Sequence, residues 1–330
     1  MASSTPLLWR RRVIAARAEA TPGLAVALGA AYGRFNVFNP EVQPDIGFED
    51  REGQGGFSPL AGVPSARGAT VTFRVELAGS GQPSAPVPEW ADVFLPACGW
   101  IETGGTGGVF VPSSLPPGAA GATTHTVTIG LYLDGKLKRL RGCMGTFRLV
   151  MTAGVPIAVE FTFTGVWDTP ETAVLVAPNY PDTQPLRFAQ AEITLGGPGS
   201  GSGVWHPTLQ EITFEAGNEV QLREDPEDES AWQCAMITGR RVTASLNPEA
   251  TLIAAKDLHT EWVERTIQEL SIEVPAGGSA DGNHVEIVAP AFQITNVQGG
   301  ERNGYAIETV EGLCARASDA GDDELTIAFS

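Results

Sequence analysis

The amino-acid sequence predicts a mainly β protein made of two tandem β-sandwich or half-barrel modules, each with a flanking α-helix. Short segments alternate apolar and polar residues, which is the pattern of half-buried strands. The 330 residues include 39 glycines and 24 prolines, so turns are frequent. One order of strands, helix and turns also occurs twice, as in a duplicated module. Together these observations favour sandwiches or barrels over α/β layers.

The clearer copy of the repeated order occupies residues 126–165. Valine, isoleucine and leucine recur at every second position of 126–133, which predicts a strand with one buried face. Asp134-Gly135 then predicts a hairpin turn, because glycine tolerates the positive φ that such turns require. The alternation resumes around 147–151 and over 157–165, so two further strands are expected there.

The second copy occupies residues 267–310, with turns expected at Asp281-Gly282 and Gly299-Gly300. We interpret the two copies as a tandem duplication; the alternative is two unrelated β meanders that share turn chemistry. A strand and a tryptophan-bearing helix are predicted before each copy, at 70–77 and 89–100 in the first and at 241–246 and 254–265 in the second.

The two helices are expected to pack on the sheets. Ala254, Leu258 and Trp262 lie one turn apart, so they form an apolar face that can cover a sheet. Trp90, Trp100 and Trp262 are expected to anchor the helical segments in the core. The alternative is a role in an interface, where aromatic residues are enriched.

Composition divides the chain into two modules and a linker. The first module is predicted over 1–168, a Pro-rich linker over 169–185 and the second module over 186–330. Residues 36–68 are rich in proline, glycine and acid and predict a long ordered loop, which usually has a function or is mobile. Residues 102–124 form a Gly/Pro-rich insertion that the second copy lacks.

Other segments fit the same β pattern. Residues 13–20 are compatible with a first strand or with a short helix, because their periodicity does not decide between them. An acidic loop is expected at 224–229. Further strands are predicted at 187–195, 209–214, 219–222 and 324–329.

The net charge of −18 is unevenly distributed. Residues 1–165 hold 13 Lys and Arg against 12 Asp and Glu, whereas residues 166–330 hold 8 against 27. Such an acidic surface repels nucleic-acid phosphates, which argues against a protein that grips DNA. It is compatible with a protein that DNA slides past without sticking. No apolar run approaches the roughly 18 residues of a membrane span, so no membrane span is expected.

The sequence contains no recognisable catalytic or metal-binding pattern, and we expect no enzyme activity and no cofactor. The four cysteines lack C-x-x-C spacing and indicate reduced thiols. The four histidines stand alone, without the i, i+4 spacing of a helical zinc site. The acidic loop 224–229 offers carboxylates to calcium but lacks the glycine-kinked ligand order of a known loop, so a solvated loop or one that faces a basic partner is favoured.

The chain resembles the major tail tube proteins of long-tailed, siphovirus-type bacteriophages. The resemblance extends over most of the chain as a pattern, and no single motif is diagnostic. The insertion at 102–124 departs from it. The segments that carry the resemblance are 12–19 with Pro22-Gly23, 142–154, 157–165 and 321–329.

The resemblance implies a virion protein made in the host cytoplasm. Proteins of this family have a β-sandwich with a flanking helix, and neighbouring subunits join their sheets into an inner β-barrel. Rings stack into a tube, with other tail proteins at its ends, and viral DNA passes through without specific binding. A chain with two modules would form a trimeric ring with pseudo-sixfold symmetry; a hexamer is the second choice.

Ring stacking needs surfaces that meet between successive rings, and charge gives the candidates. The loops 36–68 and 102–124 are candidates by their length. Opposite charges on two rings would steer their register more than they add affinity. The candidate residues are Arg10, Arg11 and Arg12 at the start of the chain and Glu224, Asp225, Glu227, Asp228 and Glu229 in the acidic loop.

Two other function classes compete with this interpretation. A distal tail, tail terminator or capsid decoration protein shares the β-sandwich architecture, and fold does not fix function. A carbohydrate-binding β-sandwich module or a glycosidase accessory domain would need exposed aromatic residues on one sheet face. Trp205 and Trp232 are the candidates for such a face.

Overall fold

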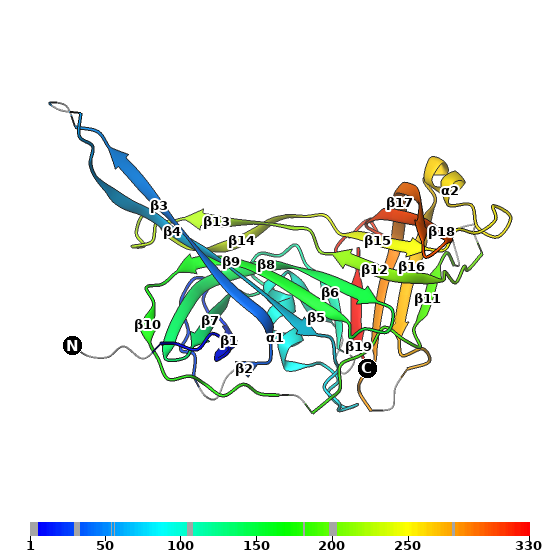
Figure 1. Ribbon diagram of the computed structural model, residues 1–330, viewed down its shortest axis with the longest axis horizontal. Coiled ribbons are helices and arrows are strands. Elements are labelled where there is room, and N and C mark those ends of the chain that lie inside the picture. The colour runs from blue at the N-terminus through cyan, green and yellow to red at the C-terminus, as the bar shows by residue number, and fades with distance from the viewer. Residues whose placement is uncertain are drawn as a thin grey trace.

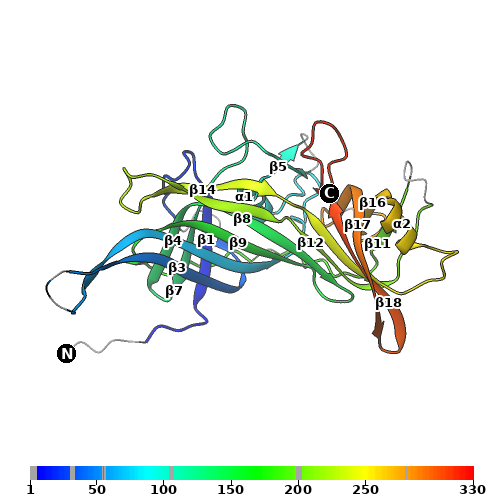
Figure 2. The same ribbon diagram turned by 90° about the horizontal axis from the view of Figure 1, so that it is seen from above.

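The computed structural model describes residues 6–29, 34–53, 55, 57–103, 108–180, 182–197, 203–278 and 281–330. The described chain is mainly β with two short helices, as the sequence predicts. Most of its strands belong to one large antiparallel sheet (Figure 1). The molecule is elongated, and a long β-hairpin projects beyond the body at one end (Figures 1 and 2). Neither described helix is long and apolar enough to cross a membrane.

Strands of the first half pair in the antiparallel order β1, β7, β8, β9, β4, β3. Short strands β2, β5, β6 and β10 border this series. The bounds are β1 (Arg12–Ala18), β2 (Arg34–Phe35), β3 (Phe38–Arg51), β4 (Leu60–Glu76), β5 (Trp100–Thr103), β6 (Val109–Pro112), β7 (Val127–Leu133), β8 (Lys136–Thr152), β9 (Ala158–Trp167) and β10 (Glu171–Thr172).

Strands of the second half pair in the antiparallel order β11, β16, β17, β18, β15, β12. Each position in this series has a counterpart in the first, from β1 and β11 at one end to β3 and β12 at the other. The bounds are β11 (Glu192–Leu195), β12 (Leu209–Glu215), β13 (Asn218–Glu224), β14 (Trp232–Arg240), β15 (Thr243–Pro248), β16 (Ile267–Val274), β17 (Val285–Arg302), β18 (Tyr305–Cys314) and β19 (Thr326–Phe329).

A pairing between β8 and β12 joins the two halves into one sheet. β8 pairs with β9 along one side, and along its other side with β7 and then with β12. The strands therefore run continuously in the order β3, β4, β9, β8, β12, β15, β18, β17, and we call this run the wall. A second junction is made by β19, which pairs with β6 of the first half.

One face of the wall is the core, and the helices lie on that side. α1 (Glu89–Ala97) begins after Pro88, and acidic residues in its first turn favour the positive end of the helix dipole. Its Phe94 is fully buried, with ring centres 4.9 Å from Phe73 of β4 and 5.4 Å from Phe161 of β9. Trp100 is also fully buried, and its indole N–H donates to the Leu325 carbonyl at 3.1 Å.

The second helix differs from the sequence prediction. α2 (Leu258–Glu264) is shorter than 254–265, and the Asp257 side chain caps it by accepting from the Thr260 amide. Trp262 is 37% exposed, so of the three tryptophans expected in the core it is the one that the prediction placed wrongly. Leu258 and a buried ion pair between Lys256 and Glu261, 2.7 Å apart, hold the helix instead.

Two loop predictions were also wrong. Residues 36–68 lie mostly in the paired strands β3 and β4 and are not a long loop. Gly299 and Gly300 lie inside β17, and the chain turns at Asn303-Gly304. The insertion at 102–124 contributes β6, which pairs with β5 and β19. The Asp134-Gly135 hairpin is confirmed, and residues 13–20 contain a strand, β1.

Candidate assembly surfaces

The joint between the halves is a strand pairing with one apolar and one charged face. Phe214 of β12 lies opposite Leu149 of β8, and both side chains are buried. Glu215 lies opposite Arg148, and the Arg148 Nε is 3.2 Å from the Glu215 Oε1. The apolar pair therefore continues the core across the joint, and the charged pair lies on the outward face.

Beyond the joint, the chain continues into the β13–β14 hairpin, which lies across β8 and β9 (Figure 2). The Asn218 side chain, at the start of β13, donates to the carbonyls of Cys98 at 2.7 Å and Gly145 at 2.9 Å. Gly142 has φ +58°, and a Cβ there would lie only 2.8 Å from Cys234 of β14. Glycine is thus required where the hairpin crosses β8.

The tip of the β13–β14 hairpin is held by ion pairs to the first half. Asp228 accepts two hydrogen bonds from Arg141 Nη2, at 2.7 and 2.8 Å, and Glu229 lies 3.0 Å from Arg67. Burial tends to raise the pKa of Asp228, but hydrogen bonds from Ser230 and Arg141 outweigh it and the pKa is lowered. Asp228 and Glu229, which the sequence suggested for ring stacking, therefore have partners within the chain.

The rest of the acidic loop is more accessible. Glu224 and Glu227 are exposed, and Asp225 accepts a hydrogen bond from the Glu227 amide at 3.0 Å. A role in ring stacking stays a prediction for all of these residues. No cluster of three or more metal-ligating side chains occurs in the described part of the chain.

The N-terminal arginines also contact their own chain. The Arg12 guanidinium donates to the Pro40 carbonyl at 2.7 Å and lies 4.0 Å from the centre of the Trp9 ring. Arg11 forms an ion pair with Asp134 at the β7–β8 turn. Arg10 is exposed. Arg12 thus lies beside the β3 edge, and its proposed stacking role stays a prediction.

A second anchor between the halves is centred on Arg240 of β14. Its Nη2 lies 2.7 Å from Asp322 and 3.3 Å from Glu324, and its guanidinium lies 5.3 Å from the centre of the Trp100 ring. Asp322 also accepts hydrogen bonds from the amide and hydroxyl of Ser114. Burial tends to raise the pKa of Asp322, but these hydrogen bonds outweigh it and the pKa is lowered.

Glu19 is a buried carboxylate that sequence reasoning missed as an important residue. It accepts from the Thr126 and Thr128 hydroxyls, both at 2.6 Å, and from the amides of Gly23 at 2.9 Å and Gly142 at 2.8 Å. These four bonds fix the turn after β1 beneath the β13–β14 hairpin. No local pattern distinguishes this glutamate from an exposed one, because three of its four partners are distant in sequence.

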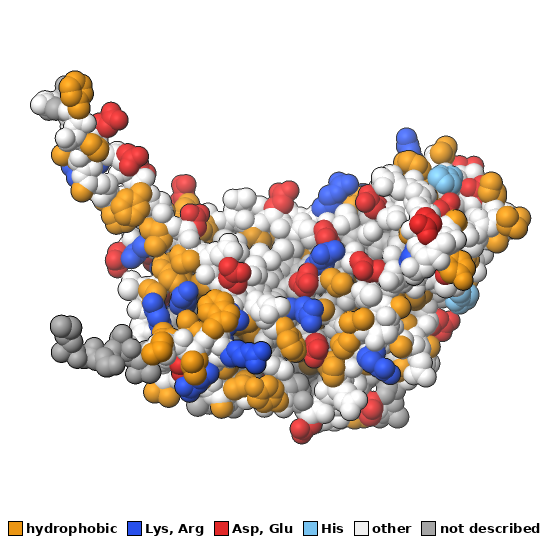
Figure 3. All heavy atoms as spheres, in the orientation of Figure 1, with side chains coloured by type: hydrophobic (Ala, Val, Ile, Leu, Met, Phe, Trp, Pro, Cys, Tyr) orange, Lys and Arg blue, Asp and Glu red, His pale blue; other side chains and the backbone are white. Residues whose placement is uncertain are grey.

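The β3–β4 hairpin projects away from the body, unlike the β13–β14 hairpin (Figure 1). We call its projecting part, the described residues between Ile46 and Val63, the arm. No strand of the described chain pairs with β3 on the side opposite β4. Several hydrophobic side chains lie along the arm, among polar and charged ones (Figure 3). Phe48 is 66% exposed, and the other exposed apolar residues of the arm are Ile46, Phe57, Leu60 and Val63.

The outward face of the wall is polar and acidic. Cross-strand rows bring Thr72, Thr162 and Thr146 side by side, and hydroxyl residues recur in the second half at Thr213, Thr243 and Ser245. Carboxylates outnumber guanidiniums on this face of the described strands. The acidic members are Glu41, Glu160, Glu211, Glu215, Glu249 and Glu311, and the basic members are Arg74, Arg148 and Arg302.

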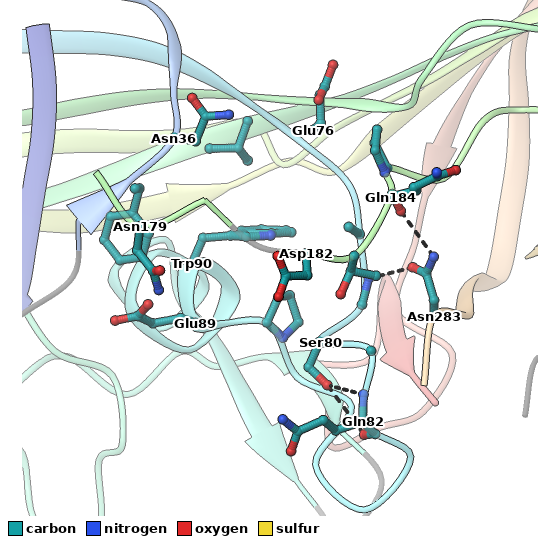
Figure 4. Close-up of a pocket in the computed structure, with 18 of the residues that line it drawn as sticks. Asn36, Glu76, Ser80, Gln82, Glu89, Trp90, Asn179, Asp182, Gln184 and Asn283 are labelled. Carbon is teal, nitrogen blue, oxygen red and sulfur yellow. Dashed lines mark hydrogen bonds between the residues drawn. The ribbon is translucent and has the colours of Figure 1, made fainter. Parts of the chain in front are cut away.

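A recess of about 920 Å³ lies between the first half, the linker and the loop before β17. Asn283 bridges its walls by accepting from the Gly79 amide at 2.9 Å and donating to the Gln184 carbonyl at 3.1 Å (Figure 4). Its described lining includes Glu76, Glu89 and Asp182 but no histidine, cysteine, lysine or arginine. The Ser80 hydroxyl in this lining donates to the Ala85 carbonyl at 2.5 Å.

The aromatic residues suggested for sugar binding do not form an exposed platform. Trp205 packs against the core, with the Lys256 Nζ 5.8 Å from its ring centre, and Trp232 is partly buried in β14. The four cysteines are free and buried, and burial raises the pKa of each thiol, to about 12 for Cys314. These thiols are thus poor nucleophiles at neutral pH.

A family model described as phage tail tube protein matches residues 9–324, which is nearly the whole chain. No curated protein shows significant similarity to the chain. The matched family is a structural one and not an enzyme class, and its members are components of the virion. The chain therefore belongs to the phage tail tube protein family.

Proposed function

We propose that copies of this chain assemble into rings that stack into the tail tube, through which viral DNA leaves the particle. The observation that carries the proposal is the wall, a single sheet that runs through both halves. Among the described residues, β3 has no partner opposite β4, and β17 has none opposite β18 beyond Gln293, where its pairing with β16 ends. Such edges present free N–H and C=O groups, and closing a ring of subunits satisfies them.

The ring is proposed to contain three chains. The two halves have the same order of antiparallel pairing, which supports a tandem duplication of one module with boundaries near 168 and 186. Three such chains supply six modules, and the ring then has pseudo-sixfold symmetry. A ring of six chains is the second choice.

The outward face of the wall is proposed to line the lumen. Threonine hydroxyls are neutral, and the surplus of carboxylates, including Glu160, Glu211 and Glu311, repels phosphates. DNA can therefore pass without adhering. The uneven charge of the sequence, with −19 in the second half from 8 basic and 27 acidic residues, supports the same role.

Ring stacking is proposed to use the N-terminal arginines and the exposed part of the acidic loop. The arm extends beyond the body of its own subunit, and its exposed apolar side chains are proposed to be covered by a neighbouring subunit. Arg10 and Arg11 on one ring and Glu224 and Glu227 on the next have opposite charges, which would steer the register.

Electron microscopy of the purified protein at high concentration tests the function directly. Hollow tubes of stacked rings are expected, with three chains per ring. A protein that stays monomeric at all concentrations and salt conditions, or that forms only isolated rings, would contradict the tube.

A further inference from the structure

The chain contains its own example of a joint between two modules, and this example specifies the joint between two chains. The inference rests on the proposed assembly into rings. In the joint within the chain, β12 of the second half pairs with the end of β8 of the first half. The counterpart of β12 is β3, and the counterpart of β8 is β17. In the described chain, β3 is open on the side opposite β4, and β17 is open after Gln293, where its pairing with β16 ends.

The register of β8 can be transferred to β17 because the two hairpins share an irregularity. In β7–β8, Val127 pairs with Cys143, and Ile129 then pairs with Leu140. In β16–β17, Gln268 pairs with Phe292, and Leu270 then pairs with Ala289. In each register shift, a step of two residues along the first strand is matched by a step of three along the second. Cys143 therefore corresponds to Phe292.

The next strands extend the correspondence, with one difference. β17 has an extra residue between Ile294 and Asn296 where β8 has none, so the positions are counted along β9 and β18. Gly145 pairs with Phe163 of β9, and Ile294 pairs with Gly312 of β18. Counting back four residues from Phe163 and from Gly312 gives Val159 and Glu308. Val159 pairs with Leu149, and Glu308 pairs with Gly299. Gly299 of β17 therefore takes the place of Leu149 of β8.

The other edge is transferred in the same way. Phe163 pairs with Val71 of β4, and Gly312 pairs with Ala244 of β15. Val71 in turn pairs with Val42 of β3, and Ala244 pairs with Phe214 of β12. Val42 therefore takes the place of Phe214, which is the residue opposite Leu149 in the joint within the chain.

We propose that β3 of one chain pairs antiparallel with β17 of the next, with Val42 opposite Gly299. Glu41 then lies opposite Gly300, and Gln43 lies opposite Gln298. Gln43 and Gln298 replace the Glu215–Arg148 ion pair of the joint within the chain.

The two glycines of β17 support this pairing. A Cβ on Gly299 would meet nothing within 4 Å, so the single chain has no steric reason for glycine there. Glycine inside a strand often marks a place where another backbone approaches closely. Residues 298–301 are exposed and lie close to the turn of the β17–β18 hairpin, so they are accessible to another chain. An incoming strand would account for glycine at position 299.

The arm extends the same correspondence. Four residues after Phe214, Asn218 contacts the carbonyl of Cys98 at the end of α1. Four residues after Val42 is Ile46, which would therefore lie at the end of α2 of the next chain. Val263 and Ile267 are exposed there, at 79% and 54%. The arm would cover these apolar side chains as the β13–β14 hairpin covers the first half.

Disulfide trapping tests the register. Gln43→Cys and Gln298→Cys are combined in one chain, because both side chains are exposed and the pairing brings their Cα atoms within disulfide range. The matched control is Gln43→Cys with Glu301→Cys, whose side chains would point to opposite faces. Tubes are formed under reducing conditions, checked by microscopy, oxidised, and analysed on a non-reducing gel.

The expected result is a ladder of covalent chains that ends at three, with at least about tenfold more cross-linked protein than in the control. When chains that carry only Gln43→Cys are mixed with chains that carry only Gln298→Cys, cross-linking should stop at dimers. Each chain then has one reactive edge. Tubes in which the two double variants cross-link equally would overturn the register. Dimers from Gln43→Cys alone would overturn head-to-tail pairing.

Hydrogen exchange of the unmodified chain gives an independent test that needs no variant. Amides of residues 41–43 and 298–300 should exchange more slowly in tubes than in monomers. Slowing confined to other edges, such as β5 or β11, would overturn the inference while leaving the tube itself intact. Failure of the unmodified protein to form tubes would instead contradict the proposed function and, with it, this pairing.

Discussion

Arg148 of β8 and Glu215 of β12 lie directly opposite each other where the two halves of the chain meet, with 3.2 Å between the Nε and Oε1 atoms. On the other face of the same strands, Phe214 and Leu149 are buried together. One pairing thus continues both the apolar core and the polar outward face from one half to the other. Within the described chain, the wall ends at β3 on one side and at β17 on the other.

The apolar side of this joint should dominate its stability. Phe214→Ala removes a fully buried ring and should lower the free energy of unfolding by about 3–5 kcal/mol. Arg148→Gln, the matched control on the outward face, should cost less than about 1 kcal/mol because its ion pair is half-exposed. Urea unfolding of the monomer measures both. Equal effects would show that the core does not continue across the joint.

Stability should fall in acid because two carboxylates that anchor the halves have lowered pKa values. For Asp228 and Asp322, the contribution is present above the ordinary aspartate pKa and is lost as the pH falls through the lower pKa of the folded state. We expect the urea midpoint to drop as the pH is lowered below about 4. Asp228→Asn with Asp322→Asn should lower the midpoint at pH 7 and flatten this dependence; an unchanged slope would contradict the assignment.

Removing the buried Glu19 carboxylate should destabilise the monomer strongly. Glu19→Ala leaves two threonine hydroxyls and two amides without their acceptor, at a cost on the order of 3 kcal/mol. Glu102→Ala, which removes an exposed carboxylate, should change stability by less than about 0.5 kcal/mol. Thermal unfolding compares them, and similar melting temperatures for the two variants would disprove a special role for Glu19.

Reversing the charge of the outward face should make tubes bind DNA. Glu160, Glu211 and Glu311 changed together to Lys should give salt-dependent retention of DNA in the lumen, because each lysine can replace phosphate counterions. The control changes Glu192, Glu264 and Glu269 to Lys, which alters the net charge equally at exposed sites outside the wall. Fluorescence anisotropy with labelled duplexes measures binding. Equal binding by both variants would argue against a lumen formed by this face.

The arm should matter for assembly but not for folding. Phe48→Ser replaces a largely exposed ring, so the melting temperature of the monomer should stay within about 2 °C of the original. Tube formation should be lost or need a much higher protein concentration, because no phenyl group would be buried between subunits at this position. Glu49→Ser, at the next position of the arm, is the control and should assemble normally. Light scattering follows assembly. Normal tube growth of the Phe48→Ser variant would exclude a role of the arm in assembly.

Sequence periodicity predicted the strands that have one buried and one polar face. The strands around 126–165 and the turn at Asp134-Gly135 are confirmed because their side chains alternate within a local segment. The segments that carried the resemblance include parts of β1, β8, β9 and β19, and the family match confirms a phage tail tube protein. What a local pattern encodes could thus be predicted.

The assembly surfaces were harder to predict because edge strands follow different rules. Pro40, Pro44 and Pro64 suggested a loop, yet proline is tolerated at a sheet edge, where its missing N–H interrupts no ladder. Gly299 and Gly300 suggested a turn because glycine is common in turns, yet both lie inside β17. The contacts of Arg12 with Pro40, and those of Glu19, join residues far apart in sequence, so no spacing could reveal them.

Counting the chains in a ring tests the central claim most directly. Cryo-electron microscopy of tubes grown from the unmodified protein should show rings of three chains, with the two halves of each chain alternating around a continuous inner sheet. Rings of six full-length chains, or a monomer whose β3 and β17 edges stay open at every concentration, would contradict the account.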